Sequence, residues 1–224
     1  KYFFSFLITA IVSSFLVLQP DIGQTLLVVF CWSILIFISG VSLLFLSTLF
    51  CTLIIACFYL IMFVTKFAYI KSRIFSFFNK ELGTHNFQSD KALDSIISGG
   101  FFGKGIGEGT LKNKVPEAHT DYIISVISEE FGVISIILIL FIFLIFIYLV
   151  FKKINLEKND RIKLILTGCV SLILLQALIH IGVNIRLFPT TGMTLPYLSY
   201  GGSSIVSVSI LSGIILNLTK RKIG

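Results

Sequence analysis

Long apolar runs dominate this sequence. They occupy residues 2–18, 22–39, 41–64, 123–151, 164–185 and 203–218. A helix needs about 20 apolar residues to cross the hydrocarbon core of a bilayer, so each run is long enough or nearly so. No stretch shows the alternating polarity of a membrane β-strand. The pattern therefore predicts an all-α integral membrane protein with six transmembrane helices.

The overall composition agrees with a membrane protein. Of the 224 residues, 56% are hydrophobic and 13% are charged, whereas soluble domains carry roughly 25% charge. A net charge of +7 in such a chain indicates anionic lipid or phosphate as a partner, and no nucleic acid is expected. No cleavable signal peptide is visible. Because the sequence starts without Met, we expect a fragment or the product of a truncated gene.

The four cysteines all lie in apolar runs, at positions 31, 51, 57 and 169. Their spacing fits neither a zinc site nor a disulfide framework. We expect them to be buried as small apolar side chains.

Basic residues in short connections indicate the orientation of the helices. They lie between the fourth and fifth runs and at the end of the chain: Lys152, Lys153, Lys158, Arg161, Lys163, Lys220, Arg221 and Lys222. With six spans, both groups and Lys1 fall on one side, which the positive-inside rule makes cytoplasmic. The loop 65–122 is then external. It carries eight Lys and Arg residues, but long loops are translocated largely regardless of charge.

Two features stand out within this external loop. Residues 92–102 form an apolar stretch that is too short to span a bilayer, which favours a re-entrant or surface-lying segment. The glycine-rich residues 103–109 superficially resemble a nucleotide-binding loop, but the strand and helix that such a motif requires are absent from the sequence pattern. A flexible loop close to the membrane is the better interpretation.

Three polar clusters map to the external side. They are Gln19–Thr25, Pro116–Asp121 and Pro189–Ser204. Proline and glycine in them predict irregular backbone at membrane depth, which is tolerated where protein buries it or where it lines a polar cavity. The clusters therefore predict one external cavity. For Thr120 or Asp121 a simpler role is also open, because either could cap the helix that follows.

These three clusters resemble the signatures of the SEDS family of peptidoglycan glycosyltransferases. The matching segments are Gln-Pro-Asp-Ile-Gly-Gln-Thr from residue 19, Pro-Glu-Ala-His-Thr-Asp from residue 116 and Leu-Pro-Tyr-Leu-Ser-Tyr-Gly-Gly-Ser-Ser from residue 195. The second cluster and residues 192–196 are more similar to the cell-division branch of the family than to the elongation branch. Two positions depart from the pattern: Arg186 replaces a residue that is often small, and Thr191 replaces Lys.

The resemblance implies a fold of about ten transmembrane helices, of which this chain would hold the last six. Residues 1–224 would form one membrane domain, with the loop 65–122 outside. The implied activity is polymerisation of lipid II, a polyprenyl-pyrophosphate disaccharide-pentapeptide, at the outer face of the cytoplasmic membrane during division. The implied partners are membrane lipids, a class B penicillin-binding transpeptidase and other division proteins.

Asp121 matches the proposed catalytic carboxylate of the family. A positioned carboxylate can accept the proton that a sugar hydroxyl loses as it attacks an anomeric carbon. A divalent cation (Mg²⁺ or Mn²⁺, held by Glu117 or Asp121) or a basic side chain would neutralise the pyrophosphate. Among the loop cations Lys71, Arg73, Lys112 and Lys114, Arg73 fits the family's loop arginine. The expected substrate-binding residues are Asp21, Arg73, Gln88, Lys112, Lys114, Glu117, His119, Thr120, Ser199, Tyr200, Gly201, Gly202 and Ser203.

Geometry refines this expectation in three ways. Glu117, His119 and Asp121 share a face if their segment is extended. If a helix starts near Asp121, Glu129 lies on the side of Asp121 and lines the cavity, whereas Glu130 pairs with a neighbouring helix. Gly132 would permit a kink, and Gly201 and Gly202 would allow close backbone approach to a helix or to substrate.

Two other functions stay open. A flippase for the same lipid would also need a polar cavity and broken helices, but the short uncharged turn near Gly40 and the inner loops carry no matching motif. An inactive remnant of a split gene is the other alternative, against which the three intact clusters argue.

Overall fold

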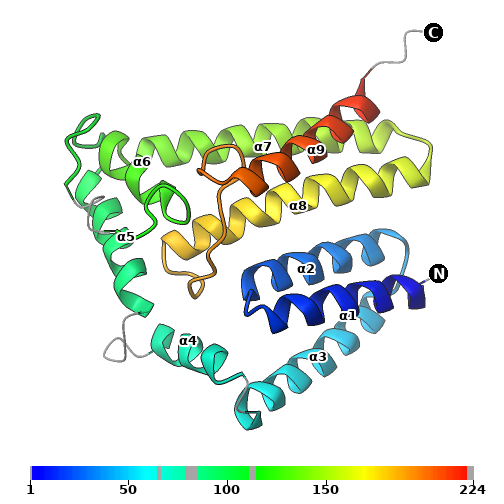
Figure 1. The fold of residues 1–224 in the computed structure, drawn as a ribbon. Helices are drawn as coiled ribbons and strands as arrows, with labels where there is room; N and C mark the ends of the chain where they lie inside the picture. Colours follow the sequence, from blue (N-terminus) through cyan, green and yellow to red (C-terminus); the bar gives the residue numbers. More distant parts are fainter. Residues whose placement is uncertain (1, 65–66, 79–84, 111–114, 221–224) are drawn as a thin grey trace.

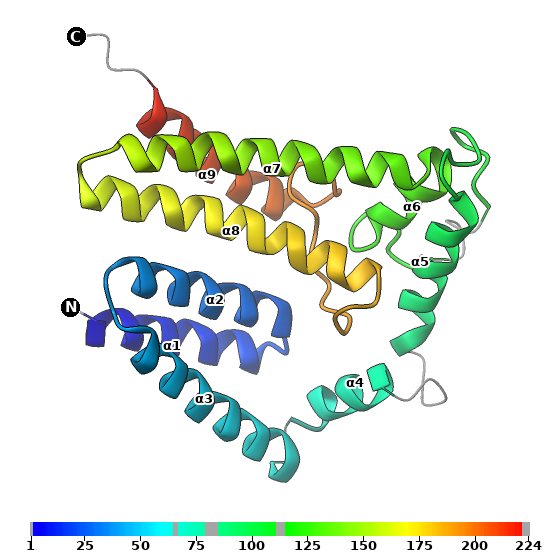
Figure 2. The same cartoon turned by 180° about the vertical axis from the view of Figure 1, so that it is seen from behind.

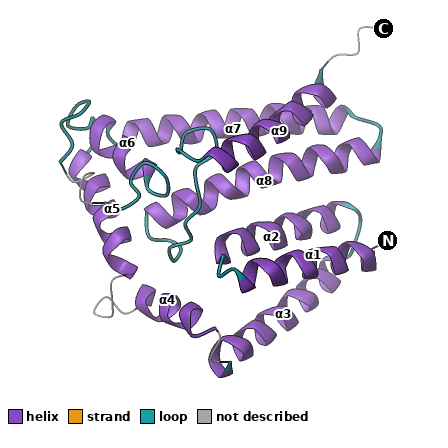
Figure 3. Ribbon diagram, in the orientation of Figure 1, coloured by secondary structure: helices purple, strands orange, loops and turns teal. Residues whose placement is uncertain are grey.

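The computed structural model describes residues 2–64, 67–78, 85–110 and 115–220. Throughout these residues the only regular structure is helical, which confirms the predicted all-α class (Figure 3). The helices are α1 Tyr2–Leu18, α2 Ile22–Ile38, α3 Leu43–Phe63, α4 Ala68–Phe78, α5 His85–Gly99, α6 Ile123–Phe131, α7 Val133–Leu156, α8 Asp160–Asn184 and α9 Gly202–Thr219.

Helix α8 is the centre of the fold. It packs against α2 on one side and against α7 and α9 on the other, and buried residues recur along its length from Leu166 to Asn184. Helices α1 to α3 form one group, α7 to α9 form the other, and α4 and α5 run across one end (Figures 1 and 2). The opposite end holds the beginning of α1 and the α7–α8 connection. The polar loops that matter for function gather at the α4–α5 end.

Three of the described helices are both long and apolar enough to cross a bilayer, namely α7, α8 and α9. Helices α1 and α2 have 17 residues each, which at 1.5 Å per residue gives about 25 Å against a core of about 30 Å. Helix α3 is apolar as well and has 21 residues. The chain is a multi-pass membrane protein, and six complete crossings stay a prediction.

The predicted helix over 123–151 is wrong as a single helix, because it breaks at Gly132. This glycine ends α6 and begins α7 with φ +79°, a conformation that L side chains rarely adopt. A Cβ at this position would lie 2.1 Å from the carbonyl oxygen of Phe101. The expected kink is therefore a full break, fixed by the chain that packs against it.

The loop 65–122 holds more structure than the sequence predicted. Helix α4 was not expected, and α5 covers 85–99 rather than 92–102. The apolar residues Phe101 and Phe102 follow α5 and are largely exposed. Helix α5 packs tightly on α6, since a Cβ on Gly99 would lie 2.0 Å from the carbonyl oxygen of Ser128.

The glycine-rich residues 103–109 are bonded to α6, which contradicts a flexible loop. The amides of Lys104 and Gly105 donate to the carbonyls of Glu129 and Glu130 at 2.9 and 3.0 Å. The Glu129 carboxylate, which is fully buried, accepts from the Thr110 amide at 2.9 Å and from Lys104 Nζ at 3.3 Å. Glu129 therefore anchors this loop instead of lining a cavity.

Glu130 also contacts the glycine-rich loop. Its Oε1 accepts a hydrogen bond from the Gly107 amide at 3.2 Å, and pairing with a neighbouring helix stays a prediction. Both acidic side chains at the end of α6 thus bind the backbone of 103–110.

The cysteines are only partly as predicted. Cys31 and Cys169 are buried and free, but Cys51 is exposed on α3, where an apolar bilayer suits it as well as a protein core would. The side chain of Cys57 lies outside the part of the chain that the structure describes.

Candidate functional site

The three polar clusters converge at the end of α8, as predicted. The turn 19–25 meets the loop 189–204 at Gly23, where a Cβ would lie 2.8 Å from Met193 and 2.9 Å from Thr191. The turn 116–122 meets the same loop, because a Cβ on Gly192 would lie 3.5 Å from Asp121 Oδ2. The loop 189–204 is thus the shared wall of the site.

The turn 116–122 is coiled and not extended. The amides of Thr120, Asp121 and Tyr122 all donate to the carbonyl of Glu117, at 3.1, 3.1 and 3.3 Å. Glu117 itself has a φ of +54°, which is uncommon for a residue with a side chain. The shared face inferred from an extended segment is therefore wrong, because one carbonyl collects three amides and curls the chain.

Neither Thr120 nor Asp121 caps α6. The N-cap position belongs to Tyr122, which makes no side-chain capping bond. The Thr120 hydroxyl instead donates within the turn, to the carbonyl and carboxylate oxygens of Glu117 at 3.1 and 2.9 Å. The Asp121 carboxylate is thus not engaged in capping the helix.

Three successive carbonyls of this turn are held by the segment from α8 to α9. The carbonyl of His119 accepts from the Tyr200 amide at 3.0 Å, that of Thr120 from Ser199 Oγ at 2.7 Å, and that of Asp121 from Asn184 Nδ2 at 3.1 Å. The ring of His119 lies edge-on to Tyr200, with centroids 6.2 Å apart. The backbone on which Asp121 sits is therefore fixed from outside its own turn.

Burial and charge raise the pKa of Asp121. The larger cause is loss of solvent around the half-buried carboxyl, and the second is the nearby negative charge of Glu117. Both disfavour the ionised form, so the carboxylate is a stronger base than an ordinary aspartate. Tyr122 is buried beside it, and its pKa is also raised by burial and by the charge of Asp121.

Arg73 reaches the site from α4. Its Nη1 donates to the carbonyl of Thr190 at 3.4 Å, and its positive charge partly offsets the raised pKa of Tyr122. Lys71 on the same helix instead lies over the ring of Phe75. Gln88 is half-buried on α5, and Lys112 and Lys114 lie outside the described residues. Among the described basic residues of the external loop, Arg73 best fits a role in the site.

The remaining predicted residues have mixed positions. Asp21 is the N-cap of α2 and accepts from the Gln24 amide at 2.9 Å. Ser203 is exposed in the first turn of α9. A Cβ on Gly201 would meet Thr194 at 3.1 Å, but one on Gly202 would meet no described atom within 4 Å. Close approach of another helix at Gly202 is therefore wrong, and approach of substrate there stays a prediction.

Sequence reasoning missed a row of polar residues on α8. Gln176, His180 and Asn184 are spaced four apart, so they lie along one face of the helix. Gln176 Nε2 donates to the carbonyl of Thr194 at 2.9 Å and lies 3.1 Å from Ser204 Oγ. His180 and Asn184 are buried. Polar side chains at regular spacing inside an apolar run carried this signal.

An apolar cavity of about 460 Å³ opens beside the site. Residues of α1, α2, α3, α4 and α8 line it, together with the loop residues 188–191. Among the described side chains that line it, Arg73 is the charged one. An apolar chamber with one guanidinium at its wall suits a lipid chain that ends in an anionic group.

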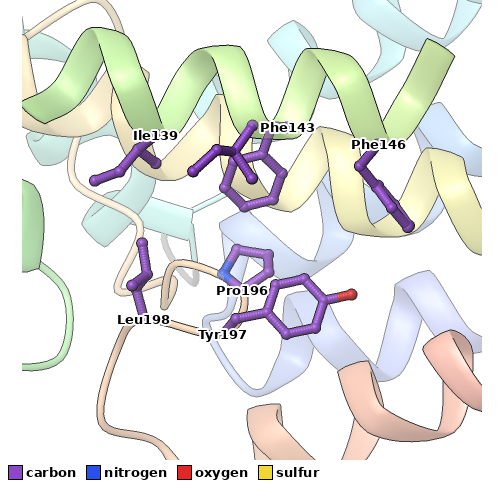
Figure 4. Close-up of a pocket in the computed structure, with 7 residues that line it drawn as sticks. Ile139, Phe143, Phe146, Pro196, Tyr197 and Leu198 are labelled. Atoms are coloured by element: carbon purple, nitrogen blue, oxygen red, sulfur yellow. The ribbon is translucent and has the colours of Figure 1, made fainter. Parts of the chain in front are cut away.

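A second apolar pocket, of about 350 Å³, separates α7 from the loop 196–198 (Figure 4). Pro196 and Tyr197 face Ile139, Phe143 and Phe146 across it. The Tyr197 hydroxyl is hydrogen-bonded to Ser212 Oγ of α9 at 2.8 Å. Its described lining is mostly apolar, which makes it a poor site for a sugar.

No group of three or more His, Cys, Asp or Glu side chains that could hold a metal occurs in the described part of the chain. Glu117 and Asp121 supply two carboxylates close enough for one to influence the other. Mg²⁺ commonly binds through one or two carboxylates together with water and substrate phosphates, so this pair fits such an ion only with substrate present.

Comparison with known proteins agrees with these observations. Residues 1–223 match the family model FTSW_RODA_SPOVE, described as "Cell cycle protein". The probable peptidoglycan glycosyltransferase FtsW of Caulobacter vibrioides is 34% identical over 225 residues, which cover 98% of this chain and 55% of that protein. The protein of the same name from Enterococcus hirae is 38% identical over 160 residues, 70% of this chain and 40% of that protein.

A solved structure has the same fold. Its description reads "Structural coordination of polymerization and crosslinking by a peptidoglycan synthase complex". It matches with a TM-score of 0.77 and 25% identity, over 97% of this chain and 60% of the other. The chain spans about half the length of the curated relatives that it matches.

Proposed function

Because the chain belongs to the cell cycle protein family of FtsW, RodA and SpoVE, we propose that it carries the catalytic half of a peptidoglycan glycosyltransferase. The protein polymerises lipid II into glycan strands at the outer face of the cytoplasmic membrane during cell division. The observation that carries this proposal is the position of Asp121, a half-buried carboxylate with a raised pKa at the junction of three polar loops.

In this proposal Asp121 is the general base. It accepts the proton of the attacking sugar hydroxyl as the new glycosidic bond forms to the anomeric carbon. The bond from that carbon to the phosphate oxygen breaks, and its electron pair leaves with the polyprenyl pyrophosphate. A positioned base of this kind contributes typically 10²–10⁴ in rate.

Arg73 and the cavity beside it receive the leaving group. The guanidinium presents a planar fork that suits phosphate oxygens, and it lies at the wall of the 460 Å³ apolar cavity. The start of the polyprenyl chain occupies that cavity. Glu117 and Asp121 would hold a divalent cation, which would supply charge neutralisation to the leaving group.

Partners and orientation are part of the same proposal. Among the similar proteins is the peptidoglycan synthase complex described above, which supports a class B penicillin-binding transpeptidase as the partner. The polar loops occupy one end of the molecule, opposite the α7–α8 connection with its basic residues (Figure 1). That arrangement supports an external site and a cytoplasmic C-terminus.

The test is polymerisation of purified lipid II by the full-length protein, with Asp121→Asn and Asp121→Glu as variants. Asn keeps the size but cannot accept the proton, so we expect turnover to fall by roughly 10²-fold or more while lipid II binding survives. Glu should retain a little activity, because its carboxylate is displaced by one methylene.

Three outcomes would overturn the proposal. Near-normal polymerisation by Asp121→Asn would return Asp121 to a structural role. Transfer of labelled lipid II across vesicle membranes, without polymerisation, would identify a flippase. Absence of both activities in the wild-type protein, with its partner present, would identify an inactive remnant.

A further inference from the structure

Asn184 is the last residue of α8, and its side chain is completely buried next to the turn that carries Asp121. Its Nδ2 donates to the carbonyl of Asp121 at 3.1 Å and to the carbonyl of His180 at 2.9 Å. A buried amide in an apolar helix costs free energy unless its hydrogen bonds are made. The bond to Asp121 spans 63 residues of sequence, so it connects the buried helix α8 to the turn that carries Asp121.

His180 completes the connection one helical turn earlier. Its Nδ1 lies 2.7 Å from the carbonyl of Met193, and its Nε2 lies 3.3 Å from Asn184 Nδ2. A carbonyl can only accept, so Nδ1 carries the hydrogen and Nε2 of the neutral ring is an acceptor that faces the amide. In this tautomer Nε2 carries no hydrogen, so no second donor opposes the Asn184 NH₂ group, whose two hydrogens go to the carbonyls of Asp121 and His180.

The pair therefore connects both walls of the site. His180 holds the loop 189–204 at Met193, the neighbour of Gly192, which itself lies beside the Asp121 carboxylate. Asn184 holds the backbone of Asp121. Because both side chains come from the buried face of one rigid helix, the distance between the carboxylate and the opposite wall is set by α8.

We infer that His180 and Asn184 are positioning residues that fix the Asp121 carboxylate for proton transfer. The inference rests on the proposed function of Asp121 and assigns no contact with substrate to either residue. Positioning matters because a displacement of about 1 Å can cost 10²-fold in rate. Loss of the hydrogen bonds from His180 or Asn184 should lower kcat and leave KM unchanged, since substrate binding does not depend on these bonds.

The first test compares Asn184→Leu with a matched control in the full-length protein. Leu has the same branched heavy-atom skeleton as Asn but cannot donate, so we expect kcat for lipid II polymerisation to fall about 10- to 100-fold, with KM within about twofold. The control is Thr167→Val, which also removes a buried polar atom from α8 but lies about 25 Å along the helix from Asn184 at 1.5 Å per residue. It should leave both constants unchanged.

A second pair of variants, at His180, distinguishes a positioning role from an effect on folding. His180→Gln can still donate at one end of its amide and accept at the other, whereas His180→Leu can do neither. We expect Gln to retain several-fold more activity than Leu at equal protein level and equal thermal stability. If Asn184→Leu fails to fold, this pair alone decides the question, and equal kcat in the two variants overturns the inference.

A double-mutant cycle with Asp121→Glu distinguishes this inference from the proposed function. The carboxylate is already displaced in the Glu variant, so adding Asn184→Leu should cost clearly less than it does in the wild type. Full additivity, or a raised KM with unchanged kcat, would contradict positioning. An active Asp121→Asn variant would instead overturn the proposed function, and an inactive one combined with normal Asn184→Leu would overturn only the inference.

Discussion

Gly192 lies directly beside the carboxylate of Asp121, although the two residues belong to different loops. A Cβ on Gly192 would stand 3.5 Å from Asp121 Oδ2, and the backbone there has a φ of +70°. The glycine thus leaves space at the open side of the carboxylate in a conformation that other residues rarely adopt. This contact joins the second and third polar clusters at the atom that the proposed chemistry uses.

We therefore expect Gly192→Ala to lower activity more than stability. The new methyl group would occupy space beside the base, and the left-handed backbone would cost about 1 kcal/mol. Lipid II polymerisation and thermal unfolding of the same preparation measure the two effects. Gly213→Ala on α9 is the matched control, because a Cβ there meets no described atom within 4 Å. Equal activity in the two variants would remove Gly192 from the site.

Glu117→Gln should shift the acid limb of the pH–rate profile to lower pH. The negative charge of Glu117 is the second cause that raises the pKa of Asp121, after burial. Removing this charge lowers the pKa, so Asp121 stays ionised and active to a lower pH. Burial remains, so the pKa should stay above that of an ordinary aspartate. The measurement is kcat against pH for both proteins. An unshifted acid limb would show that Glu117 does not influence the ionisation of Asp121.

The helices and the meeting of the polar clusters could be predicted from the sequence because both depend on local composition. Apolar runs gave the ends of α1, α2 and α9 to within about two residues, which is the usual uncertainty of helix boundaries. Helix α4 was missed because Lys71 and Arg73 interrupt its apolar pattern. The break at Gly132 depends on packing against Phe101, a contact that no local pattern encodes.

The details of the site depend on contacts between distant residues. The bond from Asn184 to Asp121 and the burial of Glu129 beneath the glycine-rich loop join segments that are 63 and 19 residues apart. The residue spacing within the turn 116–122 predicted an extended segment. In the structure the segment is coiled, because three amides donate to the Glu117 carbonyl. The row Gln176, His180 and Asn184 did carry a readable signal, since polar residues four apart in an apolar helix face a partner.

Arg73 should contribute to catalysis through its charge and its shape. Lys keeps the charge but loses the planar fork, so we expect Arg73→Lys to lose part of the rate and Arg73→Ala to lose about 10²-fold. Steady-state polymerisation of lipid II measures this. Lys71→Ala is the control on the same helix, because Lys71 lies over Phe75. Identical rates in the wild type and both Arg73 variants would leave Arg73 with a surface role.

Labelling of single cysteines should place Glu108 outside the cell and Lys158 inside. Both side chains are exposed, one in the glycine-rich loop and one between α7 and α8. The short basic connection makes the second side cytoplasmic. The native cysteines are first replaced by alanine, and a membrane-impermeant maleimide is applied to intact cells and then to opened ones. Reaction of both positions in intact cells would contradict the predicted orientation.

Exchanging the charges of Arg186 and Asp90 should restore the protection of α5 from hydrogen exchange that either single substitution removes. Arg186 lies just beyond α8 and forms an ion pair with Asp90 on α5. The pair therefore attaches α5 to the end of α8. Because Asp90 is 39% exposed, solvent screens the pair, and its loss should cost about 1 kcal/mol or less. Arg186→Asp and Asp90→Arg should each speed hydrogen exchange in α5, and the double variant should slow it again. Arg186 also has a φ of +58°, which Asp tolerates better than most residues, so the swap adds no backbone strain. Exchange in α5 that stays fast in the double variant would show that the pair does not hold this helix.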